Sequence, residues 1–180
     1  MANLTTVERQ AIVRQMALDL VAHMHVQEPP IWVENLLKNP PQVAGGAIDL
    51  SEIMAEVLDS AYFPSETVEN DLLVPASLPL PERRFSLALG LLRVVMNKLY
   101  AQADGLALLI LPNLQDSAEY FARVLLAPDP LVLAYRRTHP DSQDLAQTFL
   151  IPTRVANLRA QDLIESPLEF GRLNPGFYRS

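Results

Sequence analysis

Prolines divide this chain into short segments, and they limit its fold more than any other feature of the sequence. A proline inside a helix removes a hydrogen bond and its ring clashes with the preceding turn, so regular structure must lie between the prolines. The 15 prolines among 180 residues leave segments of helical length, with no internal repeat and no low-complexity linker. We therefore expect a helix-rich chain, punctuated at Pro29–Pro30, Pro40–Pro41, Pro75 to Pro81, Pro112, Pro128–Pro130, Pro140 and Pro152.

Apolar residues recur at helical spacing in two long segments. Residues 6–26 carry one apolar face, which predicts an amphipathic helix. Residues 81–99 carry apolar residues on both faces, which predicts a helix at the centre of the core. The residues that set the two patterns are Val13, Met16, Ala17, Leu20, Val21 and Met24, and then Phe85, Ala88, Leu91, Leu92, Val95 and Leu99.

Shorter elements are expected between and after these helices. Asp49 and Glu52 have the spacing of a capping box, which predicts a helix to about residue 60. Residues 72–74 are apolar between turn residues and predict a short strand, whereas residues 106–111 fit a strand or the start of a helix. A short helix should follow Pro30, and further helices should span about residues 113–126, 131–138, 142–149 and 153–164.

Composition excludes several functional classes. The chain has no cysteine, so disulfides, thiolate metal sites and cysteine nucleophiles are excluded. Its formal net charge of −7 argues against a nonspecific nucleic-acid binder, which needs a basic face. No apolar segment approaches the length of about 20 residues that a helix needs to span a bilayer. Charged residues such as Glu8 and Asp19 interrupt the first segment. We expect neither a membrane span nor a secretory signal, and we expect a cytoplasmic location.

Four blocks resemble a known family. Residues Arg84 to Arg93 read R-F-S-L-A-L-G-L-L-R, which is similar to the active-site helix R-F-[ST]-L-A-H-E-x-G-H of the ImmA/IrrE-type zinc metallopeptidases. Residues 118–128 resemble the family's A-[ND]-x-F-A-x-x-L-L-M-P, residues 29–34 resemble its opening P-P-[IV]-x-[IV]-E, and residues 144–159 resemble its closing segment. The blocks come in the expected order and cover most of residues 29–164.

The resemblance fails at the residues that carry the chemistry. In this family two histidines one helical turn apart bind zinc, and the glutamate between them is the general base. Leu89 and Arg93 stand at the two histidine positions and Gly90 at the glutamate position. The third ligand falls in the region from Gln115 to Ser117, where only Asp116 is acidic. Leucine has no donor atom and arginine repels a cation, so we expect no metal, no cofactor and no catalytic residue.

The resemblance implies a degenerate zincin-like metallopeptidase fold. Its class is α+β and predominantly helical, with a small sheet near residues 72–74. Residues 1–165 would form a single ImmA/IrrE-like domain, with an N-terminal helix at 6–26, the degenerate active-site helix at 81–99 and closing helices at 142–164. Residues 166–180 would be a C-terminal tail. Leu89 should be buried, where it would help to fill the vacated zinc site.

Several residues leave alternatives open. Arg93 either holds a carboxylate in a remnant cleft or forms an ion pair with Asp116 or Glu119. Trp32 either packs against the first helix or lies at a partner surface. The closing helices are similar to a helix–turn–helix pair, in which Arg154, Asn157 and Arg159 would face DNA, but the acidic chain argues against nucleic acid as a partner. His23, His25 and His139 are expected at the surface near helix ends.

The expected function is therefore that of a pseudoenzyme. Members of the family cleave or regulate helix–turn–helix repressors, so the resemblance implies a non-catalytic interaction or regulatory protein whose partner is such a transcriptional regulator. The alternative is a hydrolase with a relocated active site. No G-x-S-x-G, phosphate-loop or dinucleotide-binding glycine pattern identifies one.

Overall fold

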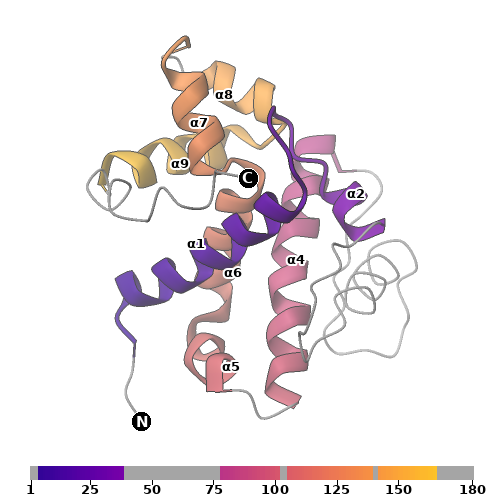
Figure 1. Cartoon of the computed structure of the whole chain (residues 1–180), viewed down its shortest axis with the longest axis vertical. Coiled ribbons are helices and arrows are strands. Elements are labelled where there is room, and N and C mark those ends of the chain that lie inside the picture. Colours follow the sequence, from indigo (N-terminus) through magenta and orange to yellow (C-terminus); the bar gives the residue numbers. More distant parts are fainter. Residues whose placement is uncertain (1–3, 39–77, 102–104, 140–141, 166–180) are drawn as a thin grey trace.

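The computed structural model describes residues 4–38, 78–101, 105–139 and 142–165, and this part of the chain is predominantly helical (Figure 1). The expected strand at residues 72–74, the helix expected after Asp49 and the tail at 166–180 lie outside the described residues. The described residues contain no strand. The elements are α1 (Thr6–His23), α2 (Val33–Lys38), α4 (Leu80–Ala101), α5 (Gly105–Ile110), the 3-10 helix η1 (Leu111–Asn113), α6 (Leu114–Leu126), α7 (Asp129–Arg136), α8 (Ser142–Phe149) and α9 (Thr153–Glu165).

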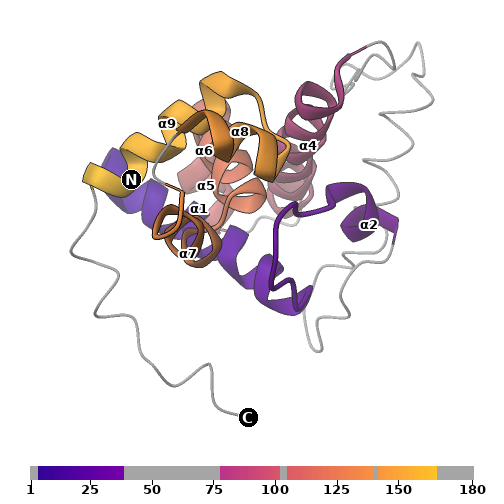
Figure 2. The ribbon, with the colours of Figure 1, turned by 90° about the horizontal axis from the view of Figure 1, so that it is seen from above.

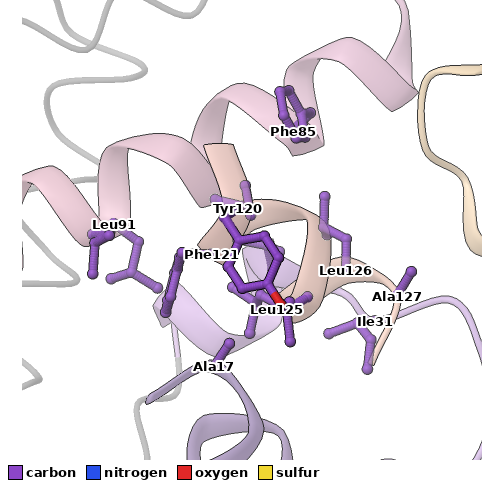
Figure 3. Packing of buried hydrophobic residues seen from close by; sticks show 14 of the residues in the cluster. Ala17, Ile31, Phe85, Leu91, Tyr120, Phe121, Leu125, Leu126 and Ala127 are labelled. Atoms are coloured by element: carbon purple, nitrogen blue, oxygen red, sulfur yellow. The ribbon is translucent and has the colours of Figure 1, made fainter. Parts of the chain in front are cut away.

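Helix α6 is the centre of the core. It packs against α1 on one side and α4 on the other, and the view from above shows it between them (Figure 2). Phe121 and Leu125 are fully buried there (Figure 3), and so is Ala118. Burying a leucine or phenylalanine side chain stabilises a fold by about 1.5–3 kcal/mol. Buried apolar residues from α1, α2 and α4 to α9 form one cluster.

The N-terminal helix begins and ends for local reasons. The hydroxyl of Thr5 accepts the backbone N–H of Glu8 at 3.3 Å, and the Glu8 carboxylate accepts the backbone N–H of Thr5 at 2.8 Å. This capping box satisfies two N–H groups at the helix start. The helix ends at His23, earlier than the expected residue 26, because the backbone turns left-handed at His25, with φ of 52°.

The remaining helices gather at the two ends of the α4–α6 pair. Helices α7, α8 and α9 lie at one end and α5 at the other (Figure 1). Residues 106–111 were expected to form either a strand or the start of a helix, and they belong to α5 and η1. Helix α7 begins two residues before the expected residue 131, because Pro128 precedes it and Pro130 lies in its first turn, where its missing N–H costs nothing. No helix in the described part of the chain is long and apolar enough to cross a membrane.

The turn between α8 and α9 is a Schellman motif built without glycine. Leu150 has φ of 50°, in the left-handed region. The N–H of Ile151 donates to the carbonyl of Ala146 at 3.0 Å. The N–H of Leu150 donates to the carbonyl of Gln147 at 3.3 Å. These are the two bonds that define the motif. They close α8 and turn the chain directly into α9.

Candidate functional site

Of the three α4 positions that the resemblance assigns to a zinc site, Leu89 and Arg93 lie on the more accessible side of the helix. Glu82, Ser86, Leu89 and Arg93 are half-buried at helical spacing, whereas Gly90 is buried. Leu89 and Arg93 share a face because they are four residues apart on the helix. Leu89 was expected to be buried, but it is only half-buried. Leu89 packs against the edge of the core and keeps part of its surface accessible.

Helix α6 brings Gln115 to this face. The guanidinium of Arg93 donates a hydrogen bond from Nη2 to Oε1 of Gln115. Nε2 of Gln115 in turn donates to Oε1 of Glu119 at 2.7 Å. Asp116 is exposed and Ser117 is buried. Of the residues from Gln115 to Ser117, it is therefore Gln115 that faces the second histidine position.

The ion pair considered for Arg93 is not formed. Within the described part of the chain, the partner of Arg93 is the neutral amide of Gln115, and neither Asp116 nor Glu119 pairs with it directly. Glu119 is connected to Arg93 only through Gln115. The sequence analysis named Glu119 as a partner of Arg93, but it could not show that the Gln115 side chain lies between the two.

The donor set at this face does not fit zinc. Leucine and glycine offer no side-chain donor, arginine is a cation, and an amide oxygen is a poor substitute for a histidine or a carboxylate. Among the residues that the structure describes, no group of three or more histidines and acids could hold a metal ion. No chemistry through a metal follows from this arrangement.

The three histidines lie elsewhere, at the surface near helix ends as expected. His23 is the last residue of α1, and its Nδ1 lies 2.7 Å from the carbonyl of Asp19. His25 is exposed. His139 stacks on the ring of Tyr135 with centroids 4.5 Å apart, and its Nδ1 lies 2.8 Å from the hydroxyl of Thr138.

Arg84 is a buried cation that the sequence analysis did not single out. Its guanidinium donates to the carbonyls of Phe149 at 2.8 Å and Leu150 at 2.6 Å, and also to that of Ile31. Burial lowers the pKa of Arg84, and the nearby charge of Glu34 partly offsets this effect. The three carbonyls belong to two separate segments, so Arg84 fastens both the approach to α2 and the α8–α9 turn to the start of α4. Its spacing from Ala88, Leu91 and Val95 places Arg84 on the buried face of α4. This spacing is the feature of the sequence from which its burial could have been predicted.

Trp32 packs on Arg84, a contact that the sequence analysis did not consider. Its ring lies over the guanidinium of Arg84, with 5.3 Å between the guanidinium carbon and the ring centroid. The side chain is 42% exposed. Trp32 therefore covers the Arg84 site with one face of its ring and meets solvent with the rest.

A second ionic cluster, buried at Asp129 and Arg159, joins four helices. The carboxylate of Asp129 accepts hydrogen bonds from Nε of Arg14 at 2.6 Å and from Nη2 of Arg159. Nε of Arg159 donates to the carbonyl of Ala127 at 2.8 Å. Asp162 accepts two bonds from Arg123, at 3.1 and 3.2 Å. The cluster thus connects α1, α6, α7 and α9 through charge-assisted bonds, which are about twice as strong as neutral ones.

The same cluster buries one of the three residues that were considered for a DNA-reading helix. Arg159 was one of three candidates for base contacts, but its side chain is buried against Asp129. Arg154 is exposed, yet it pairs with Glu82 at 2.8 Å and lies over the ring of Phe85. Of the three, only Asn157 is exposed without a described intramolecular bond. The candidate residues therefore do not form one basic reading surface.

Comparisons of the chain with models of protein families, with curated proteins and with solved structures find no match. The geometry of α4 and α6 is therefore the basis for a functional hypothesis.

Proposed function

We propose that this chain is a pseudopeptidase, a non-catalytic interaction or regulatory protein with a zincin-like fold whose small sheet would lie near residues 72–74. The contact between Arg93 and Gln115 carries the proposal. Zinc sites of this type need the metal-binding helix and the third ligand to meet across neighbouring helices. The two helices do meet at those positions, but the side chains there cannot ligate zinc.

The roles of two arginines in the resembling blocks support the proposal. Arg84 opens the block that resembles the active-site helix, and Arg159 closes the last block. Both are buried and hydrogen-bonded to backbone carbonyls of other segments. The resemblance thus includes Arg84, which holds helices together, and it fails at Leu89, Gly90 and Arg93, where catalysis would require specific side chains. Loss of the chemistry with retention of the scaffold is what a pseudoenzyme requires.

The partner class comes from analogy with the resembling family. Its members cleave or regulate helix–turn–helix repressors, so we propose that this chain binds a regulator of that kind without cleaving it, in the cytoplasm. Fold alone does not establish such a partner. The proposal therefore needs a test of both the missing chemistry and the retained binding.

The experiment measures metal content, cleavage and binding on one preparation. We expect no stoichiometric zinc by elemental analysis and no digestion of casein or of a helix–turn–helix repressor from the native host. We expect that repressor to be recovered in a pulldown with the chain. About one zinc per chain, together with a proteolytic activity that a chelator removes, would show that the chain is a working peptidase.

A hydrolase with a relocated site would need another nucleophile and base. In the described residues, a hydroxyl and an imidazole meet at Thr138 and His139, 2.8 Å apart. The His139 ring is stacked on Tyr135, and its described contacts include no carboxylate that would orient it as a base. The arrangement lacks the third group of a triad, so we favour the non-catalytic function.

A further inference from the structure

Arg93 is a half-buried cation whose described partner is neutral. Its Nη2 donates to Gln115, and Gln115 donates to Glu119 at 2.7 Å. Gln115 thus separates the guanidinium from the carboxylate, and in the described part of the chain no direct ion pair neutralises Arg93. The site where the resemblance places a zinc ion therefore still carries a positive charge.

The guanidinium has donors to spare and is held in place. It carries five N–H groups, and its described hydrogen bond uses one of them. None of its nitrogen atoms is among the buried atoms left without a partner, so the remaining donors reach solvent. The Gln115–Glu119 contact fixes the amide that holds the guanidinium, so less side-chain entropy is lost on binding. Such a planar group binds a carboxylate through two parallel N–H···O bonds.

Leu89 adds an apolar contact beside this cation. It lies one helical turn before Arg93 on the same face, and part of its side chain stays accessible. A ligand that carries a carboxylate next to an apolar group would therefore match both residues. Peptides present such a group at an apolar C-terminal residue or at an acidic side chain within an apolar segment.

We propose that Arg93 binds a carboxylate of a partner peptide at the place where the resemblance puts the zinc ion. This inference rests on the proposed function, since it specifies what a non-catalytic member of the fold would recognise there. Glu119 limits the affinity because its charge repels the incoming carboxylate. Removing that charge should tighten binding, whereas removing Arg93 should abolish it.

The test follows the Nε–Hε resonances of the arginines by NMR during titration of small ligands. N-acetyl-leucine offers a C-terminal carboxylate and N-acetyl-glutamic acid amide offers a side-chain carboxylate. The matched neutral amides serve as controls at constant ionic strength. We expect a saturable shift at Arg93 with at least one acid and none with the amides. The acid that binds identifies the source of the carboxylate. Arg137, which is exposed directly after α7, should show no saturation.

Two variants complete the test. Arg93→Gln should lose the saturable response, observed then at the neighbouring backbone amides. Glu119→Gln keeps the hydrogen bond to Gln115 and should tighten binding by about twofold to fivefold, the range for one exposed charge pair. Equal shifts at Arg93 and Arg137, or no saturation with either acid, would overturn the inference. Zinc measured in the same samples keeps the two hypotheses apart: bound zinc contradicts the proposed function, whereas a zinc-free protein without saturation contradicts only this inference.

Discussion

The guanidinium of Arg84, on α4, donates a hydrogen bond of 2.6 Å to the carbonyl of Leu150, in the turn between α8 and α9. It also holds the carbonyl of Phe149, the last residue of α8. The C-terminal carbonyls of a helix lack intrahelical partners and carry partial negative charge. A single buried side chain therefore caps α8 and fixes the closing helices to the start of α4.

Replacement of Arg84 by methionine should destabilise the protein strongly. Arg84→Met fills a similar volume but leaves buried carbonyls without a donor, and each such group costs about 1–3 kcal/mol. We expect a loss of at least about 3 kcal/mol in the free energy of unfolding, measured by urea denaturation. The control is Arg83→Met, one residue earlier and only half-buried, which should cost less than about 1 kcal/mol. Equal losses would mean that the carbonyl contacts of Arg84 contribute little.

A second stability prediction concerns Asp129. Asp129→Asn keeps the shape of the side chain but leaves Arg14 and Arg159 without their shared carboxylate. Removing one partner of a buried ion pair costs about 3–5 kcal/mol, and we expect a loss in this range. Asp116→Asn, at an exposed position of α6, should change stability by less than about 0.5 kcal/mol. A small effect of Asp129→Asn would show that water or a shift of the arginines compensates for the lost charge.

The helices were predictable from the sequence, and the polar contacts between them were not. The apolar spacing from Phe85 to Val95 identified α4 because periodicity is a local signal. The role of Arg84 depends on carbonyls some 65 residues away in the chain, which no local pattern reveals. Likewise, the contact of Arg93 with Gln115 follows from how α4 packs on α6. The resemblance limited the expected third ligand position to three neighbouring residues, and the packing places Gln115 against Arg93.

The left-handed residue Leu150 shows a different limit of sequence analysis. Helix ends of this type usually carry glycine, and leucine gives no such signal. Leu150→Gly should relieve backbone strain, whereas Leu150→Ala removes nearly the same side-chain atoms and keeps the strained Cβ. We expect the glycine variant to be more stable than the alanine variant by about 1 kcal/mol in thermal or urea unfolding. The opposite order would mean that the greater freedom of glycine in the unfolded chain outweighs the strain.

Tyr120 should make stability depend on pH in the alkaline range. Desolvation by burial raises the pKa of Tyr120 above its ordinary value. The native state then favours the neutral phenol, so the contribution is fully present below the unfolded-state pKa of about 10 and is lost as pH rises through the folded-state pKa. Compared with the parent, Tyr120→Phe should lose less stability between about pH 9 and about pH 11. Parallel curves for the two proteins would show that Tyr120 ionises as freely when folded as when unfolded.

The last prediction asks whether a zinc site can be built on α4 and α6 at the positions where the resemblance places one. Leu89→His and Arg93→His would place two imidazoles one turn apart on the accessible face of α4, and Gly90, which is buried, is left unchanged because a glutamate there would bury a carboxylate. Because Arg93 contacts Gln115, we choose Gln115→Glu for the third ligand position. The matched control carries Ser117→Glu in its place. Because Ser117 is buried, that change should bury a carboxylate away from the imidazoles and destabilise the protein. We expect zinc binding by calorimetry for the variant with Gln115→Glu, and none for the control or the parent. We expect proteolysis from neither, because a supporting shell of hydrogen bonds would still be missing. If the folded variant with Gln115→Glu binds zinc no more tightly than the parent, the register of the motif on α4 is wrong, and the proposed pseudopeptidase loses its main support.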